Sequence, residues 1–405
     1  MSNYNKVQFI SWELYTGPFS VDERPGAGWY CGLLNPALDK RLDALGQCWD
    51  IEARVAFTAD AIAKAKAREK IDGEDKSALK VFMAPEFLYR GAGGAYLHDL
   101  IGGWAGGAPK DFQLPPPYNG PWAGLFDRLR ALVAKDDYQD WVFVFGTALS
   151  ASFPTAKAAN GKYLLDPGAM GEIYNSALIQ RGGAANGASQ YISRKHYISP
   201  IDFVNRLGAA IQHHPGNVRP FLPRAVNPAD VLGATEGGAV FRLAGVNDGN
   251  GKPIDFGIEI CLDHALSGNS ANQFGRIRTA GQYVKLQLVP SGGLELTDAS
   301  IRLQPGGAAT PHSYAFNCDG LYALDDGPSG CHTQVWNGAN GASPVPAANK
   351  LVEASGGQAV AGTTLLDVAA ELTVRDHPVR ADMLWHDGDE AKGAGKVRVM
   401  KPLAL

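Results

Sequence analysis

Three apolar segments follow one another between residues 141 and 197, and no helix-forming segment separates them. They are WVFVFGTAL at 141–149, IYNSALIQ at 173–180 and QYISRKHY at 190–197. Each is short, rich in β-branched and aromatic residues and bounded by turn residues, which predicts three strands in sequence. A (β/α)8 barrel requires a helix between successive strands. The chain is therefore predicted to be an α/β protein of the layered α+β kind, in which helices cover sheets.

The remaining pattern also mixes helices and strands. Apolar residues recur at helical spacing through 49–70, at Ile51, Val55, Ala59 and Ile62, which predicts the clearest helix. A second helix is expected at 121–135, with Pro121 as an early residue. Further strands are predicted at 6–12, 79–84, 239–244, 254–261, 283–290, 315–324, 332–336 and 360–368.

Glycine and proline are unevenly spread along the chain. The 405 residues include 49 glycines and 25 prolines, which exceeds the average of about 12% for the two together. Much of the surplus falls between the predicted strands and helices. We therefore expect one domain, 1–405, enlarged by insertions, and the stretch 91–120 is expected to lack regular structure. The expected insertions are 13–45, 91–120, 206–236 and 325–350.

Charge and cysteine content exclude several classes of protein. The net charge is −4 and no run of five or six like charges occurs, so neither nucleic acid nor an anionic membrane is an expected partner. No window reaches the roughly 18 apolar residues of a membrane helix, and the start lacks a signal-peptide pattern. Five cysteines without a C-x-x-C pair favour a reducing, cytoplasmic setting. His213-His214 and Cys331-His332 lack metal-ligand spacing, so no metal or other cofactor is expected.

Three reactive side chains stand at or near the ends of apolar strands. They are Glu86 in VFMAPEF, Lys195 in YISRKHY and Cys261 in DFGIEICLDH. Each type alone is more often a cap, a solvated charge or a small core residue. Together they match the cleavage of an amide or nitrile: a thiolate attacks the carbon, a carboxylate is the base, and an ammonium lowers the thiol pKa and stabilises the tetrahedral anion.

In four blocks the sequence resembles the nitrilase superfamily of carbon–nitrogen hydrolases. In order, these blocks are VFMAPEFLY, IYNSALIQRGG, YISRKHYIS and FGIEICLDHA, and the later VKLQLVPSGG is also similar to that family. Together they span about residues 80–293. The resemblance implies a four-layer α-β-β-α sandwich, here with long Gly/Pro-rich loop insertions, and a homodimer or higher homo-oligomer.

The resemblance also implies roles for individual residues. Glu86 would be the general base and acid, Lys195 the electrostatic stabiliser and Cys261 the nucleophile that forms a thioester. The backbone N–H of Leu262 would complete the oxyanion site with Lys195. Phe87, His264 and Ser291, which stand in the same motifs, are candidate substrate contacts.

Some features depart from the family pattern and leave alternatives open. Lys195 follows Glu86 by 109 residues and precedes Cys261 by 66, and both gaps are long. A second acidic residue near the nucleophile stays unassigned between Glu236 and Asp202. Leu262-Asp263-His264 after the cysteine favours an amide or carbamoyl/ureido substrate over a nitrile. A nitrilase is the first alternative, and a (β/α)8 glycosidase using Glu86 and another carboxylate is the second. The residues do not identify the substrate itself.

Overall fold

The structure is a computed structural model, and it describes most of the chain. The described residues are 2–17, 19–20, 29–30, 44–72, 75–91, 95–152, 155–157, 159, 163–165, 171–197, 199, 202, 218–220, 238–267, 272–307, 310–320, 333–338, 350–353, 364–385 and 393–405.

Within those residues the larger of two main sheets has ten strands. The three segments predicted between 141 and 197 are confirmed as neighbours in it, because β9, β12 and β13 pair antiparallel in that order. β2 and β9 pair parallel to β5, so the carboxyl ends of β2, β5, β9 and β13 share one edge. The order is β13 (Gln190–Arg194), β12 (Gly171–Arg181), β9 (Trp141–Ser152), β5 (Ala78–Met83), β2 (Lys6–Glu13), β25 (Lys396–Val399) and β22 (Thr364–Asp367), with β14 (Val218–Pro220) on β12, β26 (Leu403–Ala404) on β2 and β6 (Tyr96–Leu97) on β9.

The second main sheet has six strands in the described part of the chain. Its centre is parallel, because β18 pairs parallel to both β17 and β19. The order is β15 (Val240–Phe241), β17 (Phe256–Ile258), β18 (Leu286–Ser291), β19 (Tyr314–Asp319), β20 (Gln334–Asn337) and β21 (Lys350–Glu353). Two open sheets are not a closed barrel, so the (β/α)8 alternative does not match this fold.

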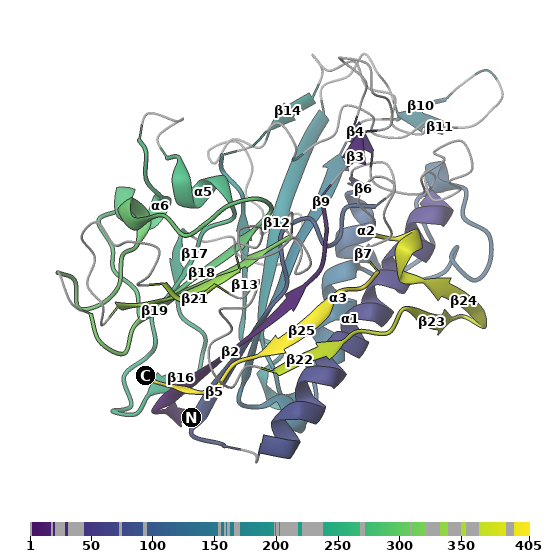
Figure 1. Cartoon of the computed structure of the whole chain (residues 1–405). Helices are drawn as coiled ribbons and strands as arrows, with labels where there is room; N and C mark the ends of the chain where they lie inside the picture. Colours follow the sequence, from purple (N-terminus) through teal and green to yellow (C-terminus); the bar gives the residue numbers. More distant parts are fainter. Residues whose placement is uncertain are drawn as a thin grey trace.

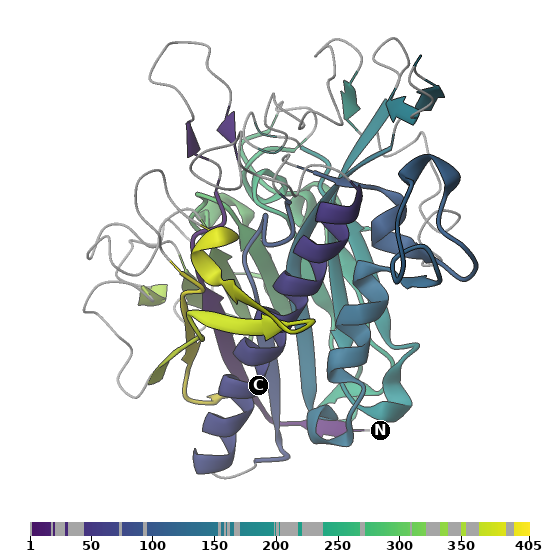
Figure 2. The same ribbon diagram turned by 90° about the vertical axis from the view of Figure 1, so that its right-hand side faces the viewer.

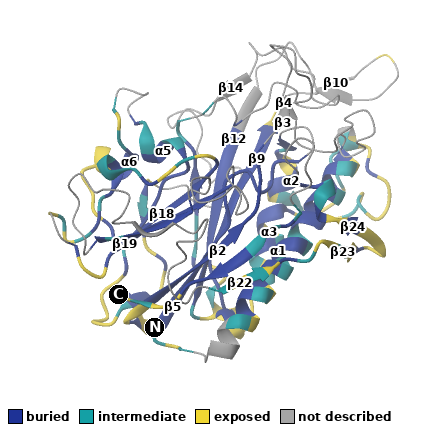
Figure 3. Cartoon of the chain, viewed as in Figure 1, coloured by how far each residue is buried: buried dark blue, intermediate teal, exposed yellow. Residues whose placement is uncertain are grey.

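The two sheets pack face to face through their apolar side chains. On β9, Val142 and Val144 join a core shared with Phe256 and Leu288 of the smaller sheet. The alternate residues of β9 point to the other face, as the two-residue period of a strand requires. Figures 1 and 3 show the buried strands of both sheets lying against each other. Mixed α and β layering is therefore confirmed.

Two helices cover the outer face of the ten-stranded sheet (Figure 2). α1 (Ala44–Asp72) and α3 (Leu125–Val133) pack their apolar stripes on Phe143 and Phe145. α3 starts later than predicted, because β8 (Trp122–Ala123) pairs with β7 (Gly103–Trp104) just before it. The expected position of Pro121 inside the helix was therefore wrong.

The outer face of the six-stranded sheet carries only short helices among the described residues. α5 (Leu262–Ala265) follows β17, and α6 (Arg276–Thr279) lies beside it. No helix of the described residues is long and apolar enough to cross a membrane. Smaller pairs are β1 (Ser2–Tyr4) with β16 (Val246–Asp248), β3 (Phe19–Ser20) with β4 (Trp29–Tyr30), β10 (Thr155–Lys157) with β11 (Tyr163–Leu165), and β23 (Glu371–Val374) with β24 (His377–Arg380).

The expected insertions differ in how much of them is described. The stretch 91–120 is not irregular throughout, because it contains β6, α2 (Asp99–Gly102), β7 and a 3-10 turn at Lys110–Phe112. Its Trp104 stacks on Trp122, with ring centroids 6.1 Å apart. The other three expected insertions lie largely outside the described residues, apart from short pieces such as β14. One domain spanning 1–405 stays a prediction.

Candidate active site

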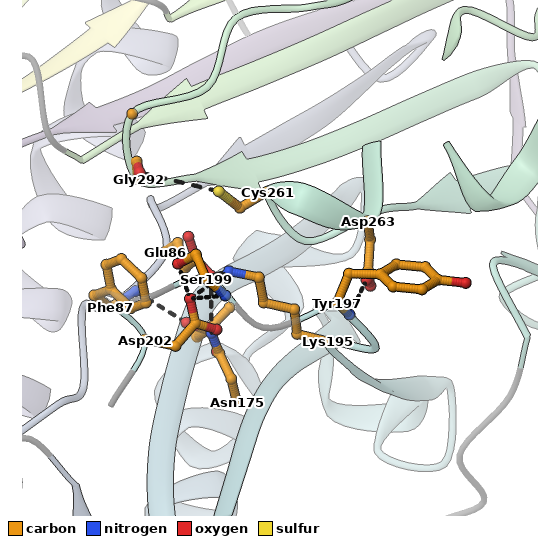
Figure 4. A network of polar contacts seen from close by, with 12 residues as sticks. Glu86, Phe87, Asn175, Lys195, Tyr197, Ser199, Asp202, Cys261, Asp263 and Gly292 are labelled. Carbon is orange, nitrogen blue, oxygen red and sulfur yellow. Dashed lines mark hydrogen bonds and ion pairs between the residues drawn. The ribbon is translucent and has the colours of Figure 1, made fainter. Parts of the chain in front are cut away.

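The three predicted catalytic side chains come together where the ends of strands from both sheets meet. β5 runs through Ala84 and Pro85 to Glu86, β13 ends one residue before Lys195, and the chain after β17 reaches Cys261. Figure 4 shows the three side chains pointing toward one another. Glu86 and Lys195 belong to the ten-stranded sheet and Cys261 to the six-stranded one, so the site lies between the two sheets.

The Lys195 ammonium lies between two carboxylates. Its Nζ is 2.8 Å from Glu86 Oε1 and 2.7 Å from Asp202 Oδ1, and all three side chains are completely buried. Asp202 is therefore the second acidic residue of the cluster in the described part of the chain. Glu236, the other candidate, lies outside the described residues.

Asn175 of β12 joins the two carboxylates on the other side. Its Nδ2 donates to Glu86 Oε1 at 2.8 Å and approaches Asp202 Oδ2 at 3.3 Å. The only sequence signal for this role was the position of Asn175 in the IYNSALIQ block. Sequence reasoning did not name Asn175 as a site residue.

The backbone on both sides of Glu86 is held by hydrogen bonds to Ser291, Thr16 and Thr147, which come from three other parts of the chain. The Glu86 N–H donates to the carbonyl of Ser291 at 3.2 Å, and its carbonyl accepts from Thr16 Oγ1 at 2.5 Å. The next amide, of Phe87, donates to Thr147 Oγ1 at 2.9 Å, and Phe87 itself has a φ of 66°. Residues in this left-handed region persist only when their surroundings determine them. These contacts fix the direction of the Glu86 side chain.

Cys261 occupies a sharp turn between its strand and α5. Its φ is 48°, its N–H donates to the Pro290 carbonyl at 3.1 Å, and its Sγ lies 3.9 Å from the Gly292 carbonyl. Gly292 has no room for a side chain, because a Cβ there would lie 2.7 Å from the Phe87 ring. A strained, unusual backbone at a reactive side chain is typical of functional sites.

The Leu262 N–H is the amide expected to stabilise an oxyanion. The next two amides, of Asp263 and His264, donate to the carbonyls of Ile260 and Cys261 at 3.0 and 2.7 Å. The Leu262 N–H itself has no acceptor among the described residues. Leu262 directly follows Cys261 in the chain, so its N–H is positioned to donate to an oxygen that develops charge beside the Cys261 sulfur.

Two of the three predicted substrate contacts have other roles. The His264 Nδ1 pairs with Glu259 Oε2 at 2.6 Å, and its Nε2 accepts the Thr297 N–H at 3.0 Å. Because both ring nitrogens bind within the protein and the side chain is completely buried, the substrate role predicted for His264 does not match the structure.

The Ser291 hydroxyl likewise binds Asn317 Oδ1 at 2.8 Å, so Ser291 contributes its backbone carbonyl to the site instead. Phe87 stays a candidate, because the centre of its ring lies 5.6 Å from Lys195 Nζ.

Burial dominates the protonation of this cluster. It raises the pKa of Glu86 to about 7, against the attraction of Lys195, and Asp202 adds to the rise. Burial and Glu86 likewise raise the pKa of the Cys261 thiol well above its usual value, although Lys195 lowers it. Burial lowers the pKa of Lys195, but Asp202, Cys261 and Glu86 together raise it above its usual value.

The expected lowering of the thiol pKa is therefore wrong for the resting site. These shifts make the Cys261 thiol neutral and keep Lys195 charged at pH 7. Glu86 titrates near pH 7.

No group of three or more histidine, cysteine or acidic side chains in the described residues could hold a metal. His213-His214 and Cys331-His332 lie outside those residues. Comparison of the chain with protein-family models, with curated proteins and with solved structures finds no match. The functional assignment therefore depends on the geometry of the site and on the sequence motifs.

Proposed function

We propose that this protein is a cysteine-dependent hydrolase that cleaves a non-peptide C–N bond, of the amide or carbamoyl/ureido type, in a small molecule. The observation that carries the proposal is the buried ion cluster of Glu86, Lys195 and Asp202 beside the Cys261 turn. Buried charges are costly to keep unless they are paired, and perturbed pairs of this kind concentrate at catalytic sites.

The first half of the reaction forms a thioester. Glu86 takes the thiol proton while the Cys261 sulfur attacks the carbonyl carbon, and the carbonyl oxygen becomes an oxyanion. The Leu262 N–H and the Lys195 ammonium donate to this oxyanion. When the intermediate collapses, the C–N bond breaks, and Glu86 returns the proton to the leaving nitrogen.

The second half hydrolyses the thioester. Glu86 removes a proton from water, which attacks the same carbon, and the proton then passes to the departing Cys261 sulfur. Lys195 keeps its charge through both halves, because Asp202 and Glu86 raise its pKa. The site needs no group beyond its own side chains and water for this cycle.

The fold supports membership of the nitrilase superfamily as part of the proposal. A helix layer, two packed sheets and the short helices α5 and α6 match the order of an α-β-β-α sandwich. Under this proposal the protein is a cytoplasmic enzyme that forms a homodimer or larger homo-oligomer and binds a small-molecule substrate. A nitrile is the alternative substrate for the same thiol.

The test combines a substrate screen with trapping of the intermediate. The purified protein is assayed for ammonia or amine release from a panel of small amides, ureido compounds and nitriles. Mass spectrometry of the wild-type protein, quenched during turnover, is expected to show an acyl group on Cys261. Cys261→Ala is expected to lose activity by several orders of magnitude, whereas Cys318→Ala, which removes another buried thiol, keeps it. Full activity of Cys261→Ala would reject the proposal.

A further inference from the structure

Asp263 connects the two catalytic loops that come from different sheets. It stands two residues after Cys261, at the start of α5, and its side chain is completely buried. One carboxylate oxygen, Oδ1, accepts the backbone N–H groups of His196 and Tyr197, both at 2.9 Å. These are the two residues that directly follow Lys195, as Figure 4 shows for Tyr197.

The second oxygen of Asp263 has a different partner. Its Oδ2 lies 3.1 Å from Arg276 Nη1 on α6, and Arg276 is largely buried. Among the described residues, the charged and titratable groups that face Asp263 are Arg276, from α6, and His196, from the segment after β13. Oδ1 accepts hydrogen bonds from the segment after Lys195, and Oδ2 pairs with the buried positive charge of Arg276.

The two carboxylate oxygens of Asp263 have different roles. Oδ1 positions the Lys195 segment and Oδ2 pairs with Arg276, so substitutions can test the two roles one at a time. Another link between the two sheets at this edge is the hydrogen bond from the Glu86 N–H to the Ser291 carbonyl. That bond fixes Glu86 to the six-stranded sheet, and the two amides on Asp263 fix the Lys195 segment to the Cys261 turn. Loss of the Asp263 acceptor therefore removes two hydrogen bonds that connect the Lys195 segment directly to the Cys261 turn.

We propose that Asp263 is a positioning residue, whose Oδ1 sets the distance between the nucleophile Cys261 and the stabiliser Lys195 by accepting the two amides after Lys195. This inference rests on the proposed function for the roles of those two residues. A misplacement of about 1 Å in such a pair lowers turnover by about 100-fold.

The expected effect on the thiol follows from its distance to Lys195. Burial and Glu86 raise the pKa of Cys261, and the charge of Lys195 lowers it. When the Asp263 acceptor is removed, the Lys195 segment moves away from the Cys261 turn, the lowering by Lys195 weakens, and the pKa of the thiol rises. Cys261 then reacts more slowly with a small alkylating reagent at pH 7, and catalysis slows as well.

The experiment compares Asp263→Ala with Asp263→Asn by site-resolved mass spectrometry of iodoacetamide labelling across pH 6–10. Asp263→Asn keeps an oxygen for both amides and is expected to label like the wild type. Asp263→Ala is expected to label Cys261 more slowly at pH 7, with the midpoint of its pH dependence moved higher. Buried Cys48 and Cys318 serve as internal controls of folding and are expected to stay unlabelled.

Arg276→Gln tests whether the ion pair, and not the amide acceptor, is responsible. It is expected to leave the labelling of Cys261 close to wild type. Equal effects of Arg276→Gln and Asp263→Ala would overturn the proposal, as would an unchanged or lowered labelling midpoint in Asp263→Ala. Labelling of Cys48 and Cys318 in Asp263→Ala would show general loosening and would also overturn it. The labelling needs no substrate, so its outcome is independent of whether the screen for the proposed function succeeds.

Discussion

The Lys195 ammonium lies 2.8 Å from the Glu86 carboxylate, and neither side chain is exposed to solvent. Burying both charges of such an ion pair costs free energy, because each charge loses its contact with water. Here burial outweighs the attraction of Lys195 enough to raise the pKa of Glu86 to about 7. The base of the proposed reaction therefore titrates in the physiological range, which leads to the following expectations.

The rate should follow the ionisation of Glu86. Because only the carboxylate can take the thiol proton, we expect kcat/KM to rise with pH and to reach half of its plateau near pH 7, the pKa of Glu86. A pH–rate profile between pH 4 and 9 checks this. A midpoint near 4.5, the value of an exposed glutamate, would contradict it.

Glu86→Gln should lower activity and raise stability at the same time. The pKa of Glu86 is raised in the folded protein, so the stability contributed by its protonated form is present below about pH 4.5 and lost as the pH rises through about 7. Glutamine imitates the protonated form. We expect Glu86→Gln to be more stable than the wild type above pH 7, by on the order of 3 kcal/mol, with little difference below pH 5.

Denaturant unfolding at pH 5 and pH 8 measures that difference. Activity of the same variant should fall by about 10²–10⁴-fold. Glu371→Gln, an exposed position on β23, is the control and should change neither quantity. A variant that is equally stable or less stable than the wild type at pH 8 would be inconsistent with the raised pKa.

Asp202→Asn should move the pH profile to lower values. The Asp202 charge raises the pKa of Glu86, so its neutralisation should lower that pKa and shift the acid limb of kcat/KM downward. The measurement is again the pH–rate profile. An acid limb that stays in place or moves upward would show that Asp202 does not act on Glu86 through its charge.

Ser291→Ala and Thr16→Val should have opposite patterns. The Ser291 hydroxyl binds Asn317 and not the reacting groups, so its loss should cost about 1 kcal/mol of stability and leave kcat nearly unchanged. The Thr16 hydroxyl holds the Glu86 carbonyl, so Thr16→Val should lower kcat, by about tenfold. Steady-state kinetics and thermal unfolding of both variants decide the matter. A loss of substrate binding in Ser291→Ala would instead support the prediction that Ser291 contacts the substrate.

Much of the secondary structure could be predicted because it depends on local pattern. The alternation in β9 places Val142 and Val144 on one face, and the structure confirms this strand and its two successors. β25 was not predicted, because its sequence, KVRV, is short and charged. It forms a strand by pairing with β2, where Arg398 meets Glu13 at 2.8 Å.

The reactive positions could also be located from the chain alone, because a side chain that ends an apolar strand lies at the edge of a sheet wherever that sheet packs. Glu86, Lys195 and Cys261 are therefore determined by the sequence. Only the tertiary structure decided which groups surround them. Asn175 and Asp202 join the cluster, and His264 leaves it, because strand register and the packing of two sheets set distances between residues that are far apart in the sequence. The pKa of the Cys261 thiol was decided in the same way, because its burial outweighs the charge of Lys195.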